Sequence, residues 1–480
     1  MKPSLINPRY IIVLFALLAF APTLRVGFLV DDHRVIENNV TLTRWSWQDI
    51  REDFASNVFH DATEANYYRP LFNCLLRAEH SLWRFQPFGY HAINLLFHIA
   101  CALALFQLLT TLGMSQNIAL AAASLFAVHP VATDLMMVAS AGEEQMAYFL
   151  SLLSILLAQG GRRRYGGALL VFCAALFTKE SAMMTPILFA AVLIAKGSPL
   201  KEHRRWIPLA ALALLYYGWH RHVMGPTISS SDWHQVFPFF LHAFPQILAR
   251  YIAVYFWPFS LHYPRLIQPL SQPWPLFWIG WGLLMALGIR VWGRMAVFCL
   301  IWMVAGLLPK TPVMIRGFSM MDHWFYPSSL GVLLPLAAGL NALSDSSGIC
   351  RSRFGKTVYF ALLSIWTLFV YFHVRIRGSD EAMYRWTIRF EPRIISARYK
   401  LGATLLNRGR PDLALPYMEQ AYALNPDDPV NINGLAVALF QLGQHDRAIA
   451  LMEHLVAKDP SDRAGKELLE KMRKLSRGPR

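Results

Sequence analysis

The chain has 480 residues, of which 55% are hydrophobic and only 16% are charged, and its mean hydropathy is +0.33. Soluble domains carry about 25% charged residues, so this composition excludes an ordinary soluble protein and indicates a membrane protein. The formal net charge of +15 would favour nucleic acid as the partner of a soluble protein. Here much of the excess lies in short loops between apolar runs, so we expect membrane lipid, and no nucleic acid, as a partner.

Apolar runs follow one another along the first three quarters of the chain. Taking roughly 17–25 residues as the length of one span, we expect about eleven transmembrane helices. The first covers residues 10–24, the seventh covers residues 206–222, and the others begin near positions 91, 117, 146, 167, 181, 275, 295, 325 and 358. The apolar stretch 240–259, which Pro245 and Arg250 interrupt, is interpreted as a helix lying in the membrane interface.

Lysines and arginines predict the orientation of these spans. Lys2 and Arg9 precede the first run, and further basic residues cluster in every second short loop, as at 162–164 and 351–356. The positive-inside rule then places the N-terminus in the cytoplasm. The same rule places the long loops 25–90 and 225–273, and everything after about residue 375, on the outer side. We predict a multi-pass protein of a bacterial inner membrane with a periplasmic C-terminal part.

The end of the chain contains an internal repeat. Pro426 and Pro460 are 34 residues apart, and so are Ala414 and Ala448. A 34-residue period is typical of tetratricopeptide (TPR) repeats, which predicts one repeat at 395–428 and a second at 429–462. Helices at 380–390 and 464–475 are expected to cap the pair. The predicted fold class is therefore all-α, with a transmembrane domain at 1–375 and a TPR α-solenoid at 376–480.

Acidic and basic side chains gather at the expected outer ends of the transmembrane helices. Asp31 and Asp32 follow the first span directly, where a carboxylate is costly unless it is solvated or used. They could supply a general base for an acceptor hydroxyl or cap the next helix. Arg69 and Lys179 could bind a phosphate or pair with neighbouring acids. The other candidates of this kind are Tyr68, His129, Glu143, Glu144, Glu180, Lys310, Arg316 and His323.

Each of these motifs alone is compatible with a structural role. Together they would suit the binding of a lipid-linked phosphate and the activation of a hydroxyl. No P-loop, GxGxxG, zinc-ligand spacing or GxSxG motif occurs at a suitable place. The five cysteines form no CxxC pair, which indicates neither a disulfide framework nor a metal site.

These motifs, in this order, resemble the transmembrane-and-TPR O-mannosyltransferases and their bacterial relatives within the GT-C glycosyltransferase superfamily. The resemblance covers nearly the whole chain, and the segments that carry it are 28–39, 68–71, 87–98, 126–134, 178–180 and 323–328, followed by the TPR repeats. The chain departs from the family at Ala132, where a second histidine is usual, and at His323, where an arginine is usual. It also has about two repeats, whereas animal members have many.

The resemblance implies an inverting transfer of a sugar from a polyprenyl-phosphate donor to a hydroxyl on the outer face of the membrane, without a metal or other cofactor. Asp31 or Asp32 would be the general base, with Glu144 assisting. Arg69 and Lys179 would offset the charge of the departing phosphate. Arg316 and His323 are further candidates for the phosphate, and the expected supporting or acceptor-binding residues are Tyr68, His129, Glu143 and Glu180. The TPR domain would present a protein or peptide acceptor.

Three alternatives stay open at this stage. The acceptor could be an envelope glycan or lipid, in which case the enzyme class is unchanged. The chain could instead be a non-catalytic membrane scaffold whose TPR domain recruits partners, and such a scaffold should tolerate the loss of Asp31 and Asp32. A transporter would tend to show paired half-chain repeats or interrupted helices at mid-membrane, and the sequence shows no duplication of this kind.

Overall fold

A computed structural model describes residues 7–59, 67–199, 202, 204–225, 233–267, 274–317, 319–344 and 349–476. The described residues are mostly helical, and the two assigned strands, β1 (Arg265–Leu266) and β2 (Ser319–Met320), have two residues each. The chain divides into a first unit, Met1–Leu261 with Ile267–Gly378, and a second unit, His262–Leu266 with Ser379–Arg480. The prediction of an all-α polytopic protein with a C-terminal TPR region is confirmed.

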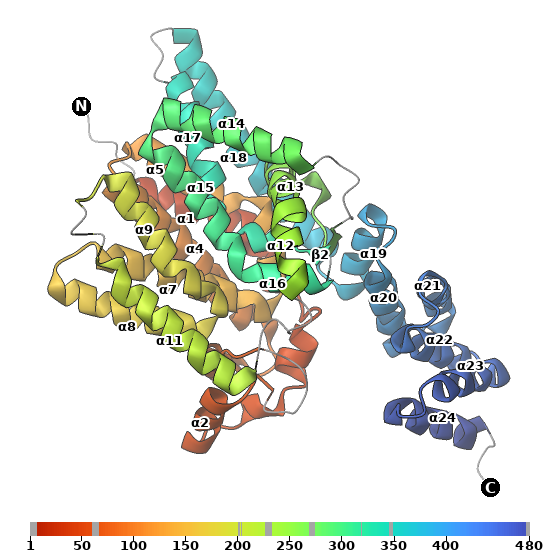
Figure 1. The fold of residues 1–480 in the computed structure, drawn as a ribbon. Helices are drawn as coiled ribbons and strands as arrows, with labels where there is room; N and C mark the ends of the chain where they lie inside the picture. Colours follow the sequence, from red (N-terminus) through yellow and green to blue (C-terminus); the bar gives the residue numbers. More distant parts are fainter. Residues whose placement is uncertain are drawn as a thin grey trace. The chain divides into compact units, whose positions relative to one another are not determined.

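The first unit is a bundle of helices (Figure 1). In chain order they are α1 (Pro8–Phe20), α2 (Trp47–Ala55), α3 (Pro70–Trp83), α4 (Pro87–Thr111), α5 (Gln116–Val128), α6 (Thr133–Met137), α7 (Gly142–Ala158), α8 (Arg162–Thr178), α9 (Thr185–Lys196), α11 (Trp206–Met224), α12 (Trp233–Pro238), α13 (Phe244–Phe256), α14 (Trp274–Trp292), α15 (Arg294–Leu307), α16 (Thr311–Gly317), α17 (Leu330–Ser344) and α18 (Ile349–Arg377).

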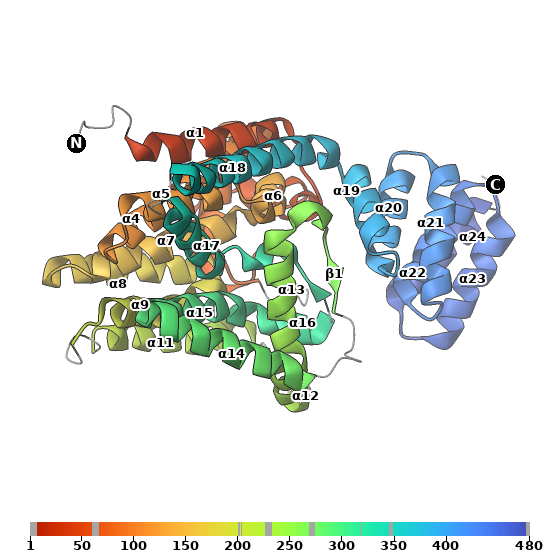
Figure 2. The ribbon, with the colours of Figure 1, turned by 90° about the horizontal axis from the view of Figure 1, so that it is seen from above.

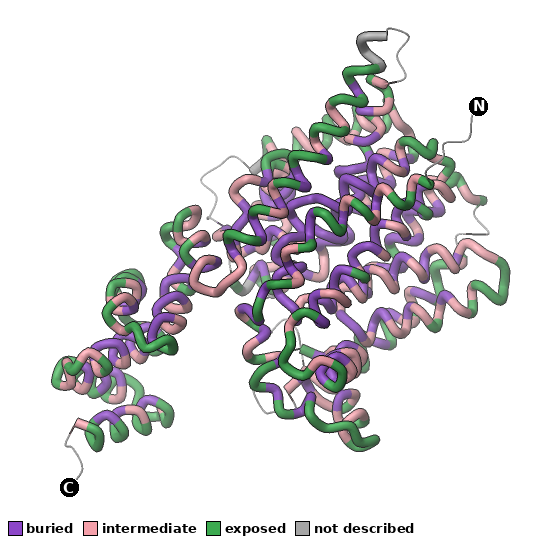
Figure 3. Tube along the Cα trace, turned by 180° about the vertical axis from the view of Figure 1, so that it is seen from behind, coloured by how far each residue is buried: buried purple, intermediate pink, exposed green. Residues whose placement is uncertain are grey.

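Small residues let the central helices of this unit approach one another closely. Helix α5 packs against α1, α4, α17 and α18 (Figure 2), and its Ala119, Ala122 and Ala123 have no exposed surface. Helix α7 lies between α4 and α8, and Ser154 of α7 donates a hydrogen bond to the Ala168 carbonyl of α8 at 2.9 Å. Figure 3 shows the buried residues running through these central helices, whereas no residue of the span Pro275–Trp292 is buried.

Within the described residues, six helical segments are long and apolar enough to cross a membrane. They are Pro8–Arg25, Pro87–Thr111, His234–Phe256, Pro275–Trp292, Arg294–Ile315 and Arg353–Arg377. A seventh is added if α5 and the segment Pro130–Met137, which are bent by 42° at the break between them, form one span. The spans expected near 146, 167, 181, 206 and 325 are helices α7, α8, α9, α11 and α17. Each of these helices either has fewer than 18 residues or is more polar than the six candidate spans. The predicted count of eleven is therefore not reached.

The segment 240–259 differs from its prediction as an interfacial helix. The helix His234–Phe256 has 23 residues and meets the measure of length and composition for a span. Pro245 directly follows the π-helical turn Phe239–Ala243, and the helix continues through it to Phe256. The interfacial interpretation is therefore not confirmed.

In its described residues, the second unit stacks six helices, as the 34-residue period predicts. They are α19 (Asp380–Phe390), α20 (Ile395–Asn407), α21 (Pro411–Leu424), α22 (Pro429–Gln441), α23 (His445–Lys458) and α24 (Arg463–Ser476). Helices α20–α21 and α22–α23 form the two repeats, with α19 and α24 at the ends of the stack. At Gly434 of α22 a Cβ atom would stand 2.8 Å from a ring carbon of Tyr399 and 2.9 Å from Sδ of Met418, so a small residue is required where the repeats meet.

Candidate functional site

Most of the predicted site residues lie where helices of the first unit begin or end. Glu143 and Glu144 are in the first turn of α7, and Lys179 follows the last residue of α8. Glu180 begins the 3₁₀ turn Glu180–Met184, and Lys310 ends the 3₁₀ turn Leu308–Lys310. Arg69 immediately precedes α3. Because alternate helix ends meet at the same end of a bundle, residues far apart in the chain come together here.

Six of these side chains form one network of ion pairs, which we call the charged cluster: Arg69, Glu143, Glu144, Lys179, Glu180 and Lys310. Lys179 Nζ lies 2.6 Å from Glu143 Oε1 and 2.9 Å from Glu144 Oε2. Lys310 Nζ lies 2.6 Å from the same Glu144 oxygen.

Arg69 completes the charged cluster from the other side. Its Nη1 pairs with Glu143 Oε2, and its Nη2 lies 3.3 Å from Glu180 Oε1. Three cations thus face three carboxylates, so the formal charges cancel. The Glu180 side chain keeps 36% of its surface exposed, whereas the Glu144 side chain keeps only 2%. Glu180 is therefore the acid of the cluster that solvent reaches most easily.

The pKa values of Glu180 and Lys179 follow this pairing. Burial disfavours the charged form of Glu180, but Arg69, Lys179 and Lys310 outweigh it and lower the pKa of Glu180 to about 2. Burial likewise disfavours the ammonium form of Lys179, but Glu143 and Glu144 raise the pKa of Lys179 above its ordinary value. Both side chains are therefore charged at neutral pH.

A small cavity adjoins the charged cluster. It has a volume of about 20 Å³, and Glu144, Tyr148, Ser151, Ser181 and Thr185 are among the residues that line it. This volume is enough for about one water molecule. Among the described residues, Glu144 Oε1 has no hydrogen-bond partner. An ordered water would satisfy it, since buried carboxylate oxygens are rarely left unpaired.

The two adjacent aspartates have different environments. Asp32 is fully buried, and its Oδ1 accepts from Ser140 N at 2.7 Å while its Oδ2 accepts from Leu29 N and Ala139 N at 3.0 Å each. Asp31 is exposed, and its side chain has no partner among the residues that the structure describes. Asp32 therefore fixes the loop after α1 to the segment just before Glu143, and Asp31 is the one that faces solvent.

Two further observations concern this loop. Burial raises the pKa of Asp32 to about 6, although its backbone hydrogen bonds act in the opposite direction. Val30, directly before Asp31, has φ of +51°. A β-branched residue rarely adopts this left-handed conformation, and such strain is concentrated at functional sites. The contacts of Asp32 hold the strained turn in place.

One face of α4 positions the loop that carries the acidic residues. His91 Nδ1 donates to the Met136 carbonyl at 3.2 Å, and Asn94 donates to the Ala139 carbonyl at 2.9 Å. His98 donates through Nε2 to the Ala127 carbonyl at 3.0 Å. At Gly142 a Cβ would stand 1.9 Å from Asn94 Oδ1, so glycine is needed there. These residues lie in the sequence segments that resembled the family, but they were not among the predicted site residues.

The remaining predicted residues have supporting positions. His129 is stacked on Tyr255, accepts from Val131 N at 3.1 Å and is 1% exposed, which is a structural role. Tyr68 is buried; its hydroxyl donates to the Phe54 carbonyl and accepts from Trp219.

The last two predicted phosphate ligands are less well placed for that role. Desolvation lowers the pKa of His323 to about 4, and the charges of Asp134, Lys179, Lys310 and Glu144 act on it. His323 therefore lies near the charged cluster but is neutral at pH 7, so it could offer a phosphate a hydrogen bond and no positive charge. The side chain of Arg316 lies outside the described residues.

Lys310 is the one member of the charged cluster to which the family resemblance gave no role. The sequence showed it only as a cation at an outer helix end. Its partner, Glu144, is 166 residues away, so no local pattern could reveal the pair. In the described part of the chain, no group of three or more His, Cys, Asp or Glu side chains is placed to hold a metal ion.

The fold and the charged cluster define a helical membrane protein with several candidate spans and a TPR domain. The family model described as tetratricopeptide repeat matches residues 405–472. The chain is 34% identical over 121 residues to protein O-mannosyl-transferase Tmtc1 of Drosophila melanogaster, which covers 25% of this chain and 14% of that protein. No solved structure matches the chain.

Two further relatives agree with this similarity. The chain is 28% identical over 239 residues to protein O-mannosyl-transferase Tmtc2 of Drosophila melanogaster, which covers 45% of this chain and 25% of that protein. It is 29% identical over 154 residues to TMTC4 of Mus musculus, with 28% and 20% covered. The chain thus spans a quarter or less of these relatives. The resemblance to transmembrane-and-TPR O-mannosyltransferases is confirmed at the level of sequence similarity.

Proposed function

We propose that this protein is a glycosyltransferase that moves a sugar from a polyprenyl-phosphate donor to a hydroxyl group of a protein. The observation that carries the proposal is the charged cluster, with three buried or half-buried cations, beside the loop of Asp31 and Asp32. Two kinds of chemical group lie on neighbouring segments, because Asp32 binds Ala139 and Ser140 just before Glu143: cations suited to a phosphate, and the exposed Asp31 carboxylate suited to a hydroxyl. The relatives are named protein O-mannosyl-transferases, so mannose is the first sugar to test.

The donor phosphate would bind by replacing a carboxylate. The charged cluster is neutral, so an added phosphate needs a cation that gives up its present partner. Arg69 can release Glu180 most easily, because their contact of 3.3 Å is the longest in the cluster and Glu180 is the most exposed of its acids. Arg69 would then bind the phosphate through its planar fork of N–H groups, while Lys179 and Lys310 remain held by Glu144.

Asp31 is the proposed general base. Its carboxylate would take the proton of the acceptor hydroxyl as that oxygen attacks the anomeric carbon. The bond from the anomeric carbon to the phosphate oxygen would break, its electron pair would stay with the polyprenyl phosphate, and the configuration would invert. Asp32 is a positioning residue, because both of its oxygens already accept backbone N–H groups. Glu144 would act through the lysines, which it holds in place.

The cellular placement is part of the same proposal. A polyprenyl-phosphate sugar that is used in an envelope would be consumed on the outer face of the inner membrane, with the N-terminus in the cytoplasm and the TPR domain in the periplasm. The TPR domain would bind the protein acceptor. No metal or cofactor is needed for this scheme, since the base is a carboxylate and the leaving group is stabilised by side-chain cations.

The test is sugar transfer by the full-length protein in membranes supplied with labelled polyprenyl-phosphate mannose and envelope proteins. Asp31→Asn should lower the transfer rate about 10²–10⁴-fold, the usual contribution of a general base. Lys179→Ala should also abolish most transfer. Glu37→Gln is the control, because Glu37 is an exposed acid of the same loop; the glutamine keeps an oxygen for the contact with His33, and the variant should leave the rate unchanged.

The alternatives give different results in the same assay. If label appears in a glycan or lipid fraction and not in protein, the enzyme class stands and the acceptor is wrong. If wild type transfers nothing from any polyprenyl-phosphate sugar, or if Asp31→Asn transfers normally, the catalytic proposal fails. The non-catalytic scaffold would then be favoured, and identifying proteins bound to the TPR domain would be the next experiment.

A further inference from the structure

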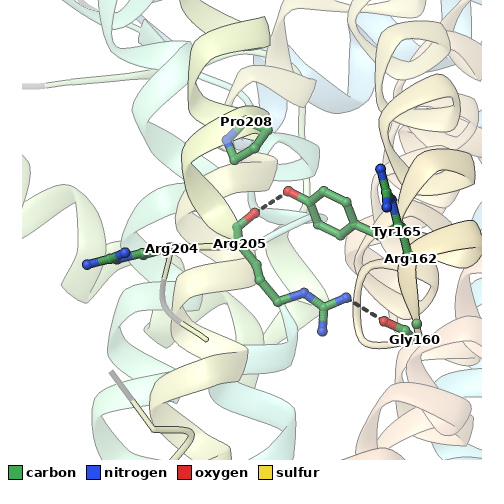
Figure 4. A pocket seen from close by; sticks show the side chains of 7 residues that line it. Gly160, Arg162, Tyr165, Arg204, Arg205 and Pro208 are labelled. Atoms are coloured by element: carbon green, nitrogen blue, oxygen red, sulfur yellow. Dashed lines mark hydrogen bonds between the residues drawn. The ribbon is translucent and has the colours of Figure 1, made fainter. Parts of the chain in front are cut away.

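A second basic site lies at the other end of α8 from Lys179. Helix α8 has 17 residues, and at 1.5 Å per residue its two ends are about 25 Å apart. The N-terminal end of α8 and the N-terminal end of α11 border a surface pocket of about 510 Å³ (Figure 4). Arg162, Tyr165, Arg204 and Arg205 are among the residues that line it. This pocket is separate from the charged cluster.

The pocket has one guanidinium group that is already fixed. Arg205 donates to the Gly160 carbonyl, and the Tyr165 hydroxyl donates to the Arg205 carbonyl. The Arg205 guanidinium carbon also lies 5.1 Å from the centre of the Tyr165 ring. Figure 4 shows Arg205 extending between the two helices, with Arg162 and Arg204 on either side. A guanidinium has five N–H donors, so Arg205 has donors left for a ligand.

Among the described residues, no acid forms an ion pair with the arginines of the pocket. Arg162 and Arg204 are exposed, and within the described ranges neither has an ion-pair or hydrogen-bond partner for its side chain. Neither α8 nor α11 has an acidic residue in its first turn or a side-chain cap at its N-terminus. The free N–H groups at the start of α8 therefore add to the field of three arginines. The charged cluster, by contrast, has an acid for every cation.

The flanks of the pocket are apolar. Trp206 and Ile207, in the first turn of α11, are 39% and 51% exposed, and Leu214 and Leu215 further along α11 are 69% and 70% exposed. Leu170 of α8 is 75% exposed. A ligand with a phosphate at one end and hydrocarbon chains at the other would satisfy both features, because its chains could lie along these helices while its phosphate meets the arginines.

We propose that this pocket binds the phosphate of an anionic phospholipid, in the membrane leaflet opposite to the charged cluster. The positive-inside tendency accounts for arginines in a loop but not for their meeting around one pocket with an anchored guanidinium at its centre. The site is distinct from any donor site, since the two phosphates would lie at opposite ends of α8. The proposed lipid site does not depend on the proposed sugar transfer.

The test measures lipid retention by the purified full-length protein in native mass spectrometry. The probes are phosphatidylglycerol, phosphatidylcholine and glycerol phosphate. The pocket variant is Arg162→Gln/Arg204→Gln, which removes no hydrogen bond of the fold. The matched control is Arg163→Gln/Arg290→Gln, which removes the same charge from exposed residues outside the pocket. Thermal unfolding of both variants checks that they are folded.

Wild type and control should retain phosphatidylglycerol in preference to phosphatidylcholine. The pocket variant should bind phosphatidylglycerol roughly 30-fold more weakly, the effect of two arginines near a membrane surface. Equal retention by the pocket variant, or an equal loss in the control, would overturn the proposal. Displacement of the lipid by glycerol phosphate alone would also overturn it, because the site would then recognise a soluble phosphate without hydrocarbon chains.

Discussion

Replacing Lys310 tests the charged cluster most directly. Lys310 Nζ and Lys179 Nζ lie 2.6 and 2.9 Å from the same Glu144 oxygen, so the two ammonium groups are at most about 5.5 Å apart. With an effective dielectric constant of about 20, the attraction of Lys310 to Glu144 is ~6 kcal/mol and its repulsion from Lys179 is at least ~3 kcal/mol. The Coulombic part of the loss in Lys310→Met is therefore at most about 3 kcal/mol, and the cost of burying the charged Lys310 side chain makes the measured loss smaller.

A double-mutant cycle separates this explanation from a simple loss of packing. Glu144→Gln leaves three cations facing two acids, so it should destabilise the protein more than the neutral combination Lys310→Met/Glu144→Gln. The free energy of unfolding is measured by titration with sodium dodecyl sulfate in mixed micelles at pH 7.5. The double variant should lose clearly less than the sum of the two single variants. Additive losses in the cycle would refute the reasoning.

Three shorter predictions concern the rest of the chain. Asp32 has a raised pKa of about 6 in the folded state, so the folded protein binds an extra proton between about pH 4 and 6. When the pH rises from 5 to 7, the unfolding free energy of the wild type should therefore fall by about 1 kcal/mol more than that of Asp32→Asn. Thermal unfolding at each pH measures this difference. Val30→Gly relieves the left-handed strain and should leave the melting temperature unchanged or raised in spite of the lost side chain; a clear drop would mean that the strain is absent. Gly434→Val would overlap Tyr399 and Met418 and should cost about 1–3 kcal/mol, seen as faster proteolysis of the TPR unit with unchanged cleavage of the first unit.

Sequence patterns predicted the elements well where the pattern is local. The 34-residue period predicted the two repeats, and the flanking helices were expected at 380–390 and 464–475, against the observed Asp380–Phe390 and Arg463–Ser476. The number of spans was harder to predict, because a buried helix in a bundle and a spanning helix have the same apolar composition. Helix α9, which was predicted as a span, has only 12 residues and is too short to cross a membrane alone.

The candidate site was predicted as a set of residue types and not as a set of contacts. The alternation of helix ends indicated that Arg69, Glu143, Glu144, Lys179 and Glu180 would lie at one end of the bundle. It could not indicate which acid pairs with which cation, because the partners are between 35 and 166 residues apart. The same limit hid the role of Lys310.

The sequence by itself determined that this protein is helical, apolar and ends in TPR repeats, because composition and periodicity are properties of neighbouring residues. Only the tertiary structure decided the roles of the two adjacent aspartates. Asp32 is buried because the backbone of Ala139 and Ser140, more than 100 residues away, reaches both of its oxygens, and Asp31 is left in solvent. Burial and pairing depend on what the rest of the chain brings into contact, and that information is not local to any motif.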